Sequence, residues 1–239
     1  MRELVELLFP TRCLLCQRHG DLVCEACLCS LPLLTGPVCT TCGSPAAAGC
    51  RECVGRRLGF RSARSAVGYR RDVARAVGAW KEGGAWRMAR VAARIIVGVV
   101  PRPAADAVTS VPPDRERALW RGHDPAGALA HELARTWQLP HQRLLERRLR
   151  VAPQKELDAE RRRTNLASAF RACGRVPQAV VIIDDVYTTG ATASVAALTL
   201  REAGARSVDV ITFARTLRSR RPDDPARSSA SVAQLESDR

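Results

Sequence analysis

The sequence contains few aromatic residues, almost no lysine and no long apolar run. Aromatic residues make up 4% of the 239 residues, and lysine occurs only at positions 81 and 155. So few aromatic side chains argue against an extended surface on which successive nucleic-acid bases stack. The tryptophans are instead expected to pack between helices, and they are Trp80, Trp86, Trp120 and Trp137.

The sequence also contains no segment with the pattern of a membrane span or of a signal peptide. The best candidate for a membrane span, 91–100, is interrupted by Arg94 and is too short to cross a bilayer. The first ten residues include Glu3 and Glu6, and they lack the basic start and long apolar core of a signal peptide. We therefore expect a cytoplasmic protein without a membrane span.

Positive charge, in contrast, is abundant. Lysine and arginine together number 38 against 24 acidic residues, which gives a formal net charge of +14. The corresponding isoelectric point is about 10.3. Such a chain attracts polyanions, either nucleic acid or polyphosphate. Its length is sufficient for one full domain and a smaller one.

The cysteines are concentrated near the start of the chain and follow a repeat. Eight of the ten cysteines form Cys-x-x-Cys pairs, and the spacing of the first two pairs recurs 26 residues later, which indicates an internal duplication. Two such pairs can complete a tetrahedral four-cysteine site, and a cytoplasmic chain with this pattern is expected to bind zinc rather than form disulfides. The predicted metal ligands are Cys13, Cys16, Cys24, Cys27, Cys39, Cys42, Cys50 and Cys53.

The simplest arrangement places one structural zinc ion in each repeat, the first at 13–27 and the second at 39–53. The spacing alone leaves open a crossed pairing of the knuckles, and also a redox-active module without metal. Cys29 and Cys173 lie outside the repeat and receive no role. A segment with so few large apolar residues is expected to depend on the metal for folding.

The most informative stretch of the chain is 180–192. Its first four residues are apolar and β-branched, a run that is typical of a buried parallel strand. Asp184 and Asp185 follow, and then the small, hydroxyl-rich segment 188–192. The apolar periodicity of 193–203 predicts a helix. The stretch is therefore expected at the carboxyl end of a strand, the edge at which open α/β sheets bind ligands.

The chemistry of this stretch suits a ribose 5-phosphate. Backbone N–H groups at 189–192, the threonine hydroxyls and the helix dipole favour a phosphate. Two adjacent carboxylates suit a diol or a metal-bound polyphosphate better than a bare phosphate. The simpler alternative is an ordinary strand–loop–helix turn in which Asp184 and Asp185 cap the helix.

The stretch closely resembles the phosphoribosyl pyrophosphate (PRPP) signature of type I phosphoribosyltransferases, which is a hydrophobic strand, two acids and a Thr-Gly-containing phosphate loop. The resemblance implies that Asp184 and Asp185 contact the ribose 2- and 3-hydroxyls and are the catalytic carboxylates. It also implies that PRPP is held through its 5-phosphate by the loop that follows, which consists of Thr188, Thr189, Gly190, Ala191 and Thr192.

A second segment is similar to the ComF family, in which Val-Pro is followed by a basic stretch and Arg-Gly-Phe-Asn. Residues 111–112 and 121–122 match this pattern, whereas His123 and Asp124 replace Phe-Asn. For His123 we favour a structural role over a catalytic one. Lys81 resembles a lysine that is common at this place in the family, although a solvated helix end is an equally good interpretation.

The resemblance also assigns arginines to the leaving group. Arginine forks match the oxygens of pyrophosphate in pairs, and the resemblance implies this role for Arg117 and Arg121. Around 154–170 the chain is similar to a Gln–Leu–Arg–Asn–Phe pattern of the family, in which Arg162 (or Arg161) matches the arginine. In type I enzymes a loop here closes over PRPP and excludes water, but the composition is equally typical of a charged surface helix.

The expected fold is an α/β type I phosphoribosyltransferase fold, a mostly parallel sheet flanked by helices, preceded by a small four-cysteine zinc-ribbon module. We expect a double zinc-ribbon module at 1–58, a phosphoribosyltransferase domain at 59–217 and a disordered tail at 218–239. The segment 144–151 is expected to form a strand or a loop. Strands are otherwise expected at 63–69, 107–111, 180–183 and 208–213, and helices at 72–80, 86–100, 125–137 and 193–203.

A double zinc ribbon followed by this domain is the layout of the ComF family, which is linked to natural transformation and to incoming single-stranded DNA. The resemblance implies transfer of ribose 5-phosphate from PRPP, with magnesium, to an unknown base or amine. A non-enzymatic protein that binds single-stranded DNA and keeps the PRPP site as a sensor or relic is the alternative. A glutamine-using purine-pathway enzyme is disfavoured, because Met1-Arg2 offers no N-terminal nucleophilic cysteine.

Overall fold

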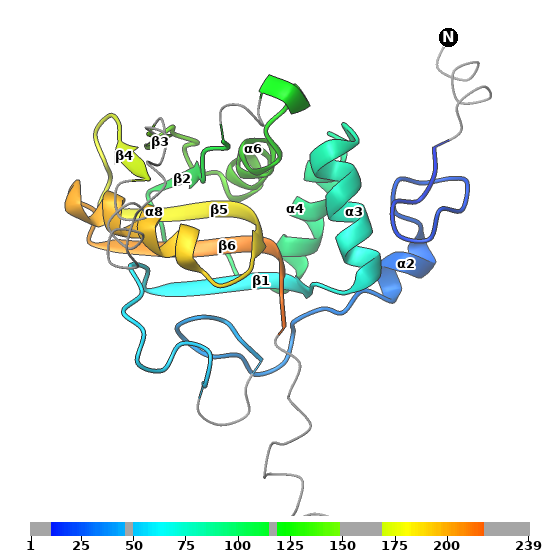
Figure 1. Cartoon of the computed structure of the whole chain (residues 1–239), viewed down its shortest axis with the longest axis horizontal. Helices are drawn as coiled ribbons and strands as arrows, with labels where there is room; N and C mark the ends of the chain where they lie inside the picture. The colour runs from blue at the N-terminus through cyan, green and yellow to red at the C-terminus, as the bar shows by residue number, and fades with distance from the viewer. Residues whose placement is uncertain (1–10, 46–49, 115–118, 149–168, 218–239) are drawn as a thin grey trace, which may run out of the picture.

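The computed structural model describes residues 11–45, 50–114, 119–148 and 169–217. Its centre is a four-stranded sheet with the order β1-β6-β5-β2, in which every neighbouring pair is parallel (Figure 1). A two-stranded antiparallel sheet, β3-β4, lies beside it. The mostly parallel α/β fold that the sequence predicts is therefore confirmed. The strands are β1 (Ser62–Gly68), β2 (Ala107–Ser110), β3 (Leu145–Arg147), β4 (Phe170–Ala172), β5 (Ala179–Tyr187) and β6 (Ser207–Arg215).

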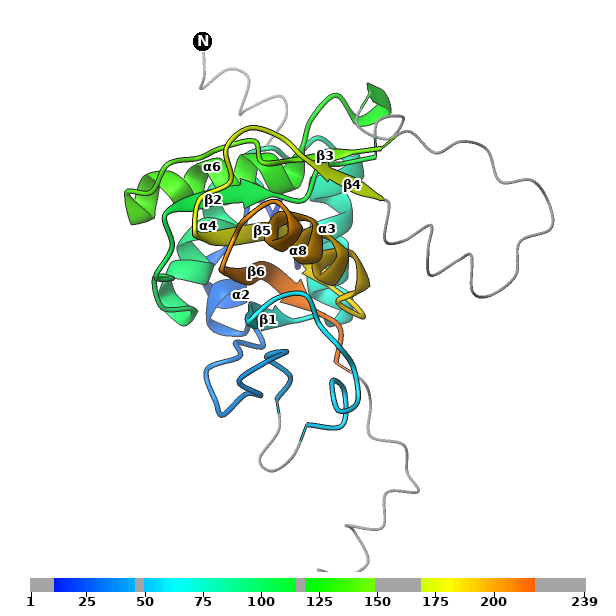
Figure 2. The same cartoon turned by 90° about the vertical axis from the view of Figure 1, so that its left-hand side faces the viewer.

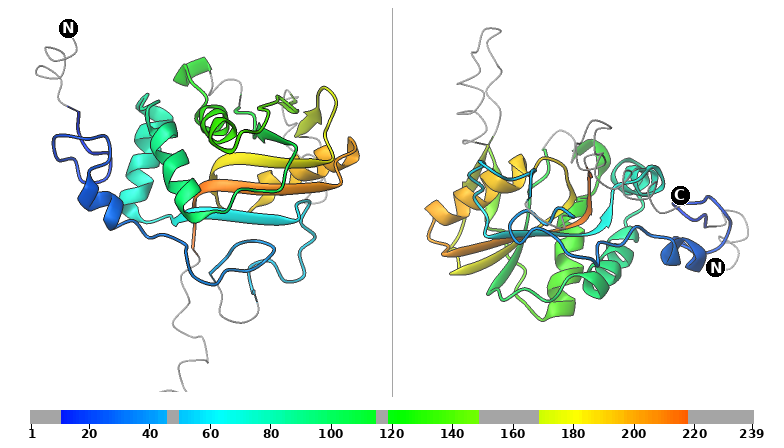
Figure 3. Two further views of the ribbon diagram at one scale, coloured as in Figure 1. Left: turned by 180° about the vertical axis from the view of Figure 1, so that it is seen from behind. Right: turned by 90° about the horizontal axis from the view of Figure 1, so that it is seen from below.

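Helices cover both faces of the central sheet (Figures 1 and 3). Helices α3, α4 and α6 share one hydrophobic core with the sheet, and α8 shares a second core on the opposite face. Among the described residues the helices are α2 (Glu25–Cys29), α3 (Arg71–Glu82), α4 (Met88–Val99), α6 (Pro125–Trp137) and α8 (Ala191–Glu202). The bounds of α3, α4, α6 and α8 lie within two residues of the predicted ones.

Strand alternation explains how β5 supports both cores. Val181 and Ile183 pack into the core with α3, α4 and α6, whereas Val180 and Ile182 pack into the core with α8. Successive side chains of a strand point to opposite faces, so a strand covered on both sides must be apolar at every position. This is the reason why the run of four β-branched residues has no polar alternation.

Helix α3 shows the local logic of the helical layer. Its buried residues recur at helical spacing, and they are Val73, Ala76, Val77 and Trp80. Gly83 ends the helix, and Lys81 in the last turn complements the negative end of the helix dipole. The same packing leaves Trp86 and Trp120 outside, with exposed fractions of 69% and 79%. The expectation of helix packing was correct for Trp80 and Trp137 but wrong for these two.

The two cysteine repeats pack at different places on the sheet domain (Figures 2 and 3). Cys13 and Leu15 of the first repeat join the core that contains α3, and Arg75 of α3 donates to the Leu15 carbonyl at 2.9 Å. The second repeat lies along β1, where Ala63 N–H donates to the Thr41 carbonyl at 2.7 Å. This contact covers part of an edge strand that would otherwise expose unpaired backbone groups.

We expect Ile182→Ala to lower the free energy of unfolding by roughly 2–5 kcal/mol, because this side chain of β5 is completely buried in the core that β5 shares with α8. The matched control is Val97→Ala, since Val97 is 40% exposed on α4. Urea denaturation followed by circular dichroism measures both effects. Equal losses in the two variants would contradict the assigned core.

Candidate functional site

The two aspartates lie within β5, at its carboxyl end. The prediction placed the end of the strand before them, but the strand continues to Tyr187 because β6 pairs with it as far as Arg215. Alternation within the strand directs Asp185 to the same face as Ile183, toward α3, and directs Asp184 to the face of Ile182. The two carboxylates are therefore held in fixed and different directions.

Lys81 pairs directly with one carboxylate, and the charges of Lys81 and Arg147 both act on the other. Asp185 is 9% exposed, and its carboxylate forms an ion pair with Lys81 Nζ at 2.7 Å. The Asp184 carboxylate accepts a hydrogen bond from the Asp185 N–H at 2.9 Å and interacts with the charge of Arg147 on β3. Lys81 thus contacts the candidate site instead of forming a solvated helix end, because α3 ends above the aspartates.

Asp184, although only partly buried, is an unusual carboxyl group. Desolvation, together with the negative charge of Asp185, raises the pKa of Asp184 to about 7. The charges of Lys81 and Arg147 act in the opposite direction but do not compensate. A carboxyl group with such a pKa carries a partial proton near neutrality, which is a frequent property of functional sites.

The loop after β5 has the form of an anion site. Thr188, Thr189 and Thr192 are exposed, and Thr189 Oγ1 accepts a hydrogen bond from the Ala191 N–H at 3.3 Å at the amino end of α8. Gly190 has a φ of +74°, and a Cβ at this position would lie 2.2 Å from the Tyr187 hydroxyl. Only glycine fits this turn, and the turn presents exposed hydroxyls beside the positive end of a helix dipole.

The segment that departs from the family pattern holds two elements together. The ring of His123 lies with Nε2 2.6 Å from the Trp80 carbonyl and Nδ1 3.1 Å from the Arg121 carbonyl. Asp124 caps α6 by accepting from the Gly127 N–H at 3.0 Å. Both contacts are structural, and the contact to Trp80 fixes the end of α3 that carries Lys81.

Of the three arginines predicted to bind pyrophosphate, the structure describes Arg121. Arg121 donates from Nε to Glu82 at 3.1 Å and forms a second, parallel contact with the same carboxylate. A pyrophosphate at this place would therefore have to displace Glu82 from the guanidinium. Arg117 and Arg162 lie outside the described residues, and so does most of the predicted lid around 154–170.

Arg147 is a site residue that the sequence interpretation missed. It lies on β3, Nε donates to the Pro112 carbonyl at 3.3 Å, and its guanidinium stacks on the Phe170 ring at 5.0 Å. The sequence predicts only a strand or a loop at 144–151, because one arginine among many gives no signal of its own. Its position follows from the pairing of β3 with β4, which brings two segments separated by more than 20 residues together.

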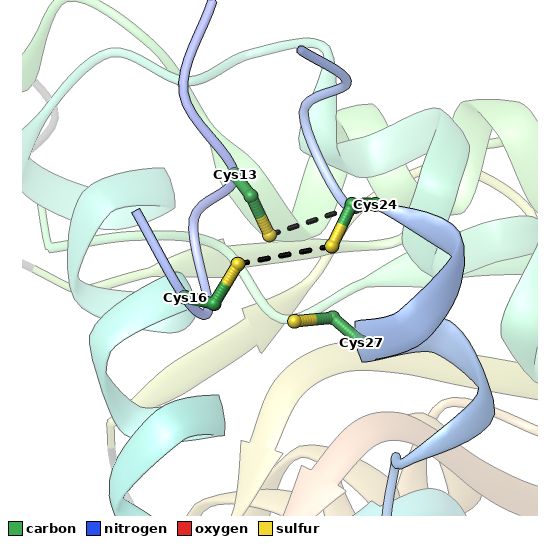
Figure 4. A group of neighbouring side chains, drawn as sticks. All are labelled: Cys13, Cys16, Cys24 and Cys27. Atoms are coloured by element: carbon green, nitrogen blue, oxygen red, sulfur yellow. Dashed lines mark hydrogen bonds between the residues drawn. The ribbon is translucent and has the colours of Figure 1, made fainter. Parts of the chain in front are cut away.

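The eight repeat cysteines form two separate clusters. In each cluster the four sulfur atoms lie within 4.8 Å of one another, and the clusters are Cys13, Cys16, Cys24, Cys27 and Cys39, Cys42, Cys50, Cys53. Figure 4 shows the sulfurs of the first cluster converging, with Cys27 on α2. The sequential pairing is therefore confirmed over the crossed one. Four convergent sulfurs suit a tetrahedral structural zinc ion.

Local hydrogen bonds prepare one thiol of each cluster for metal binding. Burial opposes ionisation of Cys13 and Cys39, but backbone N–H donors, led by those of Cys16 and Cys42 respectively, outweigh it and lower the pKa of each thiol to about 6. A thiolate is the form that binds metal. Cys29 and Cys173 belong to neither cluster, and the Cys173 thiol donates to the Arg143 carbonyl at 3.1 Å.

Comparison with known proteins supports the ribbon module and the family resemblance. Residues 4–55 match the family model named Double zinc ribbon domain. The chain is 31% identical over 115 residues to Competence protein F of Haemophilus influenzae, covering 46% of this chain and 50% of that protein. It is 38% identical over 121 residues to DNA utilization protein YhgH of Salmonella typhi, covering 48% and 52%. The chain thus spans about half the length of the curated relatives it matches.

Solved structures resemble the chain more distantly. A structure titled as the allosteric regulatory enzyme of purine biosynthesis is 23% identical, with a TM-score of 0.36, over 52% of this chain and 24% of that chain. A phosphoribosylpyrophosphate synthetase from Mycobacterium smegmatis is 20% identical, with a TM-score of 0.33, over 57% and 36%. Such weak similarity carries no argument about activity. Within the described part of the chain, no helix is sufficiently long and apolar to cross a membrane.

The raised pKa of Asp184 predicts a characteristic pH dependence of stability. The folded state binds the Asp184 proton more tightly than the unfolded state, so its contribution to stability is lost as pH rises from about 4 to about 7. We expect Asp184→Asn to gain stability relative to the wild type by up to about 1.4 kcal/mol per pH unit over this range. Urea denaturation at several pH values measures the difference. A constant difference across the range, like that expected for the control Glu132→Gln on α6, would contradict the assignment.

The two clusters predict a defined metal content. We expect two zinc ions per wild-type chain and one in each of Cys24→Ser and Cys50→Ser, because these cysteines occupy equivalent positions in separate clusters. Inductively coupled plasma mass spectrometry on the purified protein counts the zinc. Loss of both ions from either single variant would show that the clusters do not bind independently.

Proposed function

We propose that this chain binds PRPP and transfers its ribose 5-phosphate to an acceptor with release of pyrophosphate. The observation that carries the proposal is the sequence of groups along β5 and α8. Asp184 and Asp185 stand at the carboxyl end of a parallel sheet, and the Thr-Thr-Gly-Ala-Thr loop follows at a helix amino end. Diol-binding carboxylates beside an anion loop match the two ends of a ribose 5-phosphate.

In this proposal the loop 188–192 binds the 5-phosphate, and the aspartates accept hydrogen bonds from the ribose 2- and 3-hydroxyls. The bond from C1 to the pyrophosphate oxygen breaks, both electrons leave with pyrophosphate, and the acceptor nitrogen supplies the pair that forms the new bond to C1. Asp184 and Asp185 stabilise the positive charge that develops on the ribosyl centre. Arg121, together with Arg117 and Arg162, would receive the pyrophosphate.

The donor set also fits a magnesium ion bound with PRPP, because hard cations prefer carboxylate oxygens and Asp184 and Asp185 are both carboxylates at the carboxyl end of β5. When bound, magnesium would supply positive charge that stabilises the pyrophosphate leaving group. The ion pair with Lys81 and the partial proton on Asp184 limit the negative charge of the two carboxylates. Exclusion of water by the segment between β3 and β4 would complete the site.

A role in the use of incoming DNA is part of the proposal, supported by relatives named Competence protein F and DNA utilization protein YhgH. The net charge of +14 is compatible with single-stranded DNA as a partner. The proposed location is the cytoplasm, where PRPP and reduced thiols are both available. A non-enzymatic DNA-binding protein with a PRPP sensor would share all these features except turnover.

We expect isothermal titration calorimetry at pH 8 with magnesium to show PRPP binding to the wild type. The double variant Asp184→Asn, Asp185→Asn should bind at least ~100-fold more weakly, since neutral amides replace both charged acceptors for the ribose hydroxyls. Glu132→Gln is the control, because Glu132 lies on α6 and its carboxylate pairs with Arg135 of the same helix. Unchanged PRPP affinity in the double variant would overturn the site.

Turnover is tested by screening free bases and amines for PRPP-dependent release of pyrophosphate by zinc-loaded protein. Release with one acceptor supports the transferase. Steeply salt-dependent binding of single-stranded DNA that the aspartate changes leave intact, with no release for any acceptor, would instead favour the non-enzymatic alternative.

A further inference from the structure

The second cysteine cluster contacts the candidate phosphate loop, and a buried arginine makes the connection. Arg215, the last residue of β6, is completely buried. Its Nη1 donates to the carbonyl of the cluster residue Cys42 at 2.6 Å, and its Nη2 donates to Glu52 at 2.7 Å. Glu52 lies between Cys50 and Cys53 and also accepts from the Ser44 hydroxyl at 2.7 Å.

The same guanidinium reaches the loop through Tyr187. The Arg215 guanidinium lies 4.8 Å from the centre of the Tyr187 ring, a cation–π contact. The Tyr187 hydroxyl in turn fills the space beside Gly190, where a Cβ would lie 2.2 Å away. A continuous set of contacts therefore runs from the cluster carbonyl to the turn that shapes the loop.

Two further contacts join the chain that follows the cluster to the loop and to α8. Arg56, whose N–H donates to the Cys53 carbonyl at 3.1 Å, donates from Nη2 to the Thr189 carbonyl at 2.8 Å. The Gly59 N–H donates to the Ser194 hydroxyl in the first turn of α8 at 2.9 Å. The chain leaving the cluster thus holds both the loop and the helix whose amino end faces it.

Comparison of the two repeats distinguishes the residues that contact the loop from the residues that bind the metal. Positions 26 residues apart are equivalent, and all four metal-binding cysteines recur in both repeats. Glu52 and Arg56, however, correspond to Ala26 and Ser30, which lack the charges that make these contacts. The second repeat therefore carries the groups that reach the loop, and the first repeat does not.

The same specialisation occurs in the turn after the second knuckle cysteine. Gly43 corresponds to Gln17, and the two residues have nearly the same φ of +70° and +67°. A Cβ at position 43 would lie 2.3 Å from the Ala63 carbonyl, so only glycine allows the close approach to β1. Both repeats form the same turn, but only the second is adapted to lie against the sheet.

We propose that the second cysteine cluster, when it holds zinc, acts as a clamp on the phosphate loop 188–192, with Arg215 as its positioning residue. A closed zinc site fixes the Cys42 carbonyl and Glu52, these fix Arg215, and Arg215 fixes Tyr187 against Gly190. Zinc at the first cluster has no such effect on the loop. The statement that this loop binds a phosphate group rests on the proposed function. The clamp itself does not depend on that function.

The duplication provides a matched test in the full-length chain. Cys50→Ser and Cys24→Ser alter equivalent positions, and each variant should retain one zinc ion. Hydrogen–deuterium exchange of peptides covering 186–194 should be at least ~10-fold faster in Cys50→Ser and within ~2-fold of the wild type in Cys24→Ser. Binding of ribose 5-phosphate, measured by calorimetry, should weaken by similar factors.

A second pair of variants tests the connection without touching a metal ligand. Arg215→Met should raise loop exchange at least ~10-fold while two zinc ions stay bound, whereas Arg75→Met removes the comparable contact to the Leu15 carbonyl and should leave the loop unchanged. If Arg215→Met fails to fold, Glu52→Gln removes the charge on the partner with little change in shape. Glu52→Gln should raise loop exchange in the same direction.

Equal effects of Cys24→Ser and Cys50→Ser on the loop would overturn the clamp, as would wild-type loop exchange in a folded Arg215→Met or Glu52→Gln variant. Failure of the wild type to bind ribose 5-phosphate would overturn the proposed function instead. In that case the exchange measurements still decide whether the clamp exists.

Discussion

The site depends on one constraint, the alternation of side chains along a strand that is buried on both faces. Because β5 continues through both aspartates, Asp185 faces α3 and meets Lys81, while Asp184 faces the opposite layer and the charge of Arg147. Two adjacent carboxylates repel each other at the edge of an apolar sheet, and these cations offset that cost only in part, so the pKa of Asp184 remains raised. Helix α3, strand β3 and the His123 contact that holds the end of α3 all serve this arrangement.

The two cysteine repeats have the same metal-binding geometry but pack at different places on the sheet domain. Both bring four sulfurs together in the same way, so both satisfy the needs of a tetrahedral metal. Their surfaces differ, because the first contributes apolar residues to the core beside α3 and the second contributes Glu52 and Arg56 to polar contacts. A small metal-bound unit is rigid without a large core of its own, which makes it suitable for holding a loop in place.

Much of this molecule could be predicted from the sequence because its strongest signals are local. The β-branched run 180–183, the helical periodicity of α3 and the 26-residue cysteine repeat each lie within one segment, and the structure has each of them. The interpretation failed where the answer depends on distant partners. Trp86 and Trp120 are apolar side chains at positions that the fold leaves exposed, and neither local pattern nor residue type distinguishes them from the buried Trp80.

Residue type and spacing along the chain are sufficient to predict the parallel strand with its two acids, the glycine turn after it and the two groups of four thiols. How the cysteine pairs combine depends on the tertiary structure, and so do the Lys81–Asp185 ion pair, the effect of the Arg147 charge on Asp184 and the link from a cysteine cluster to the loop through Arg215. The physical reason is that ion pairs, desolvation and metal geometry depend on distances of a few ångströms between segments far apart in the chain. Those distances are set by how the layers pack.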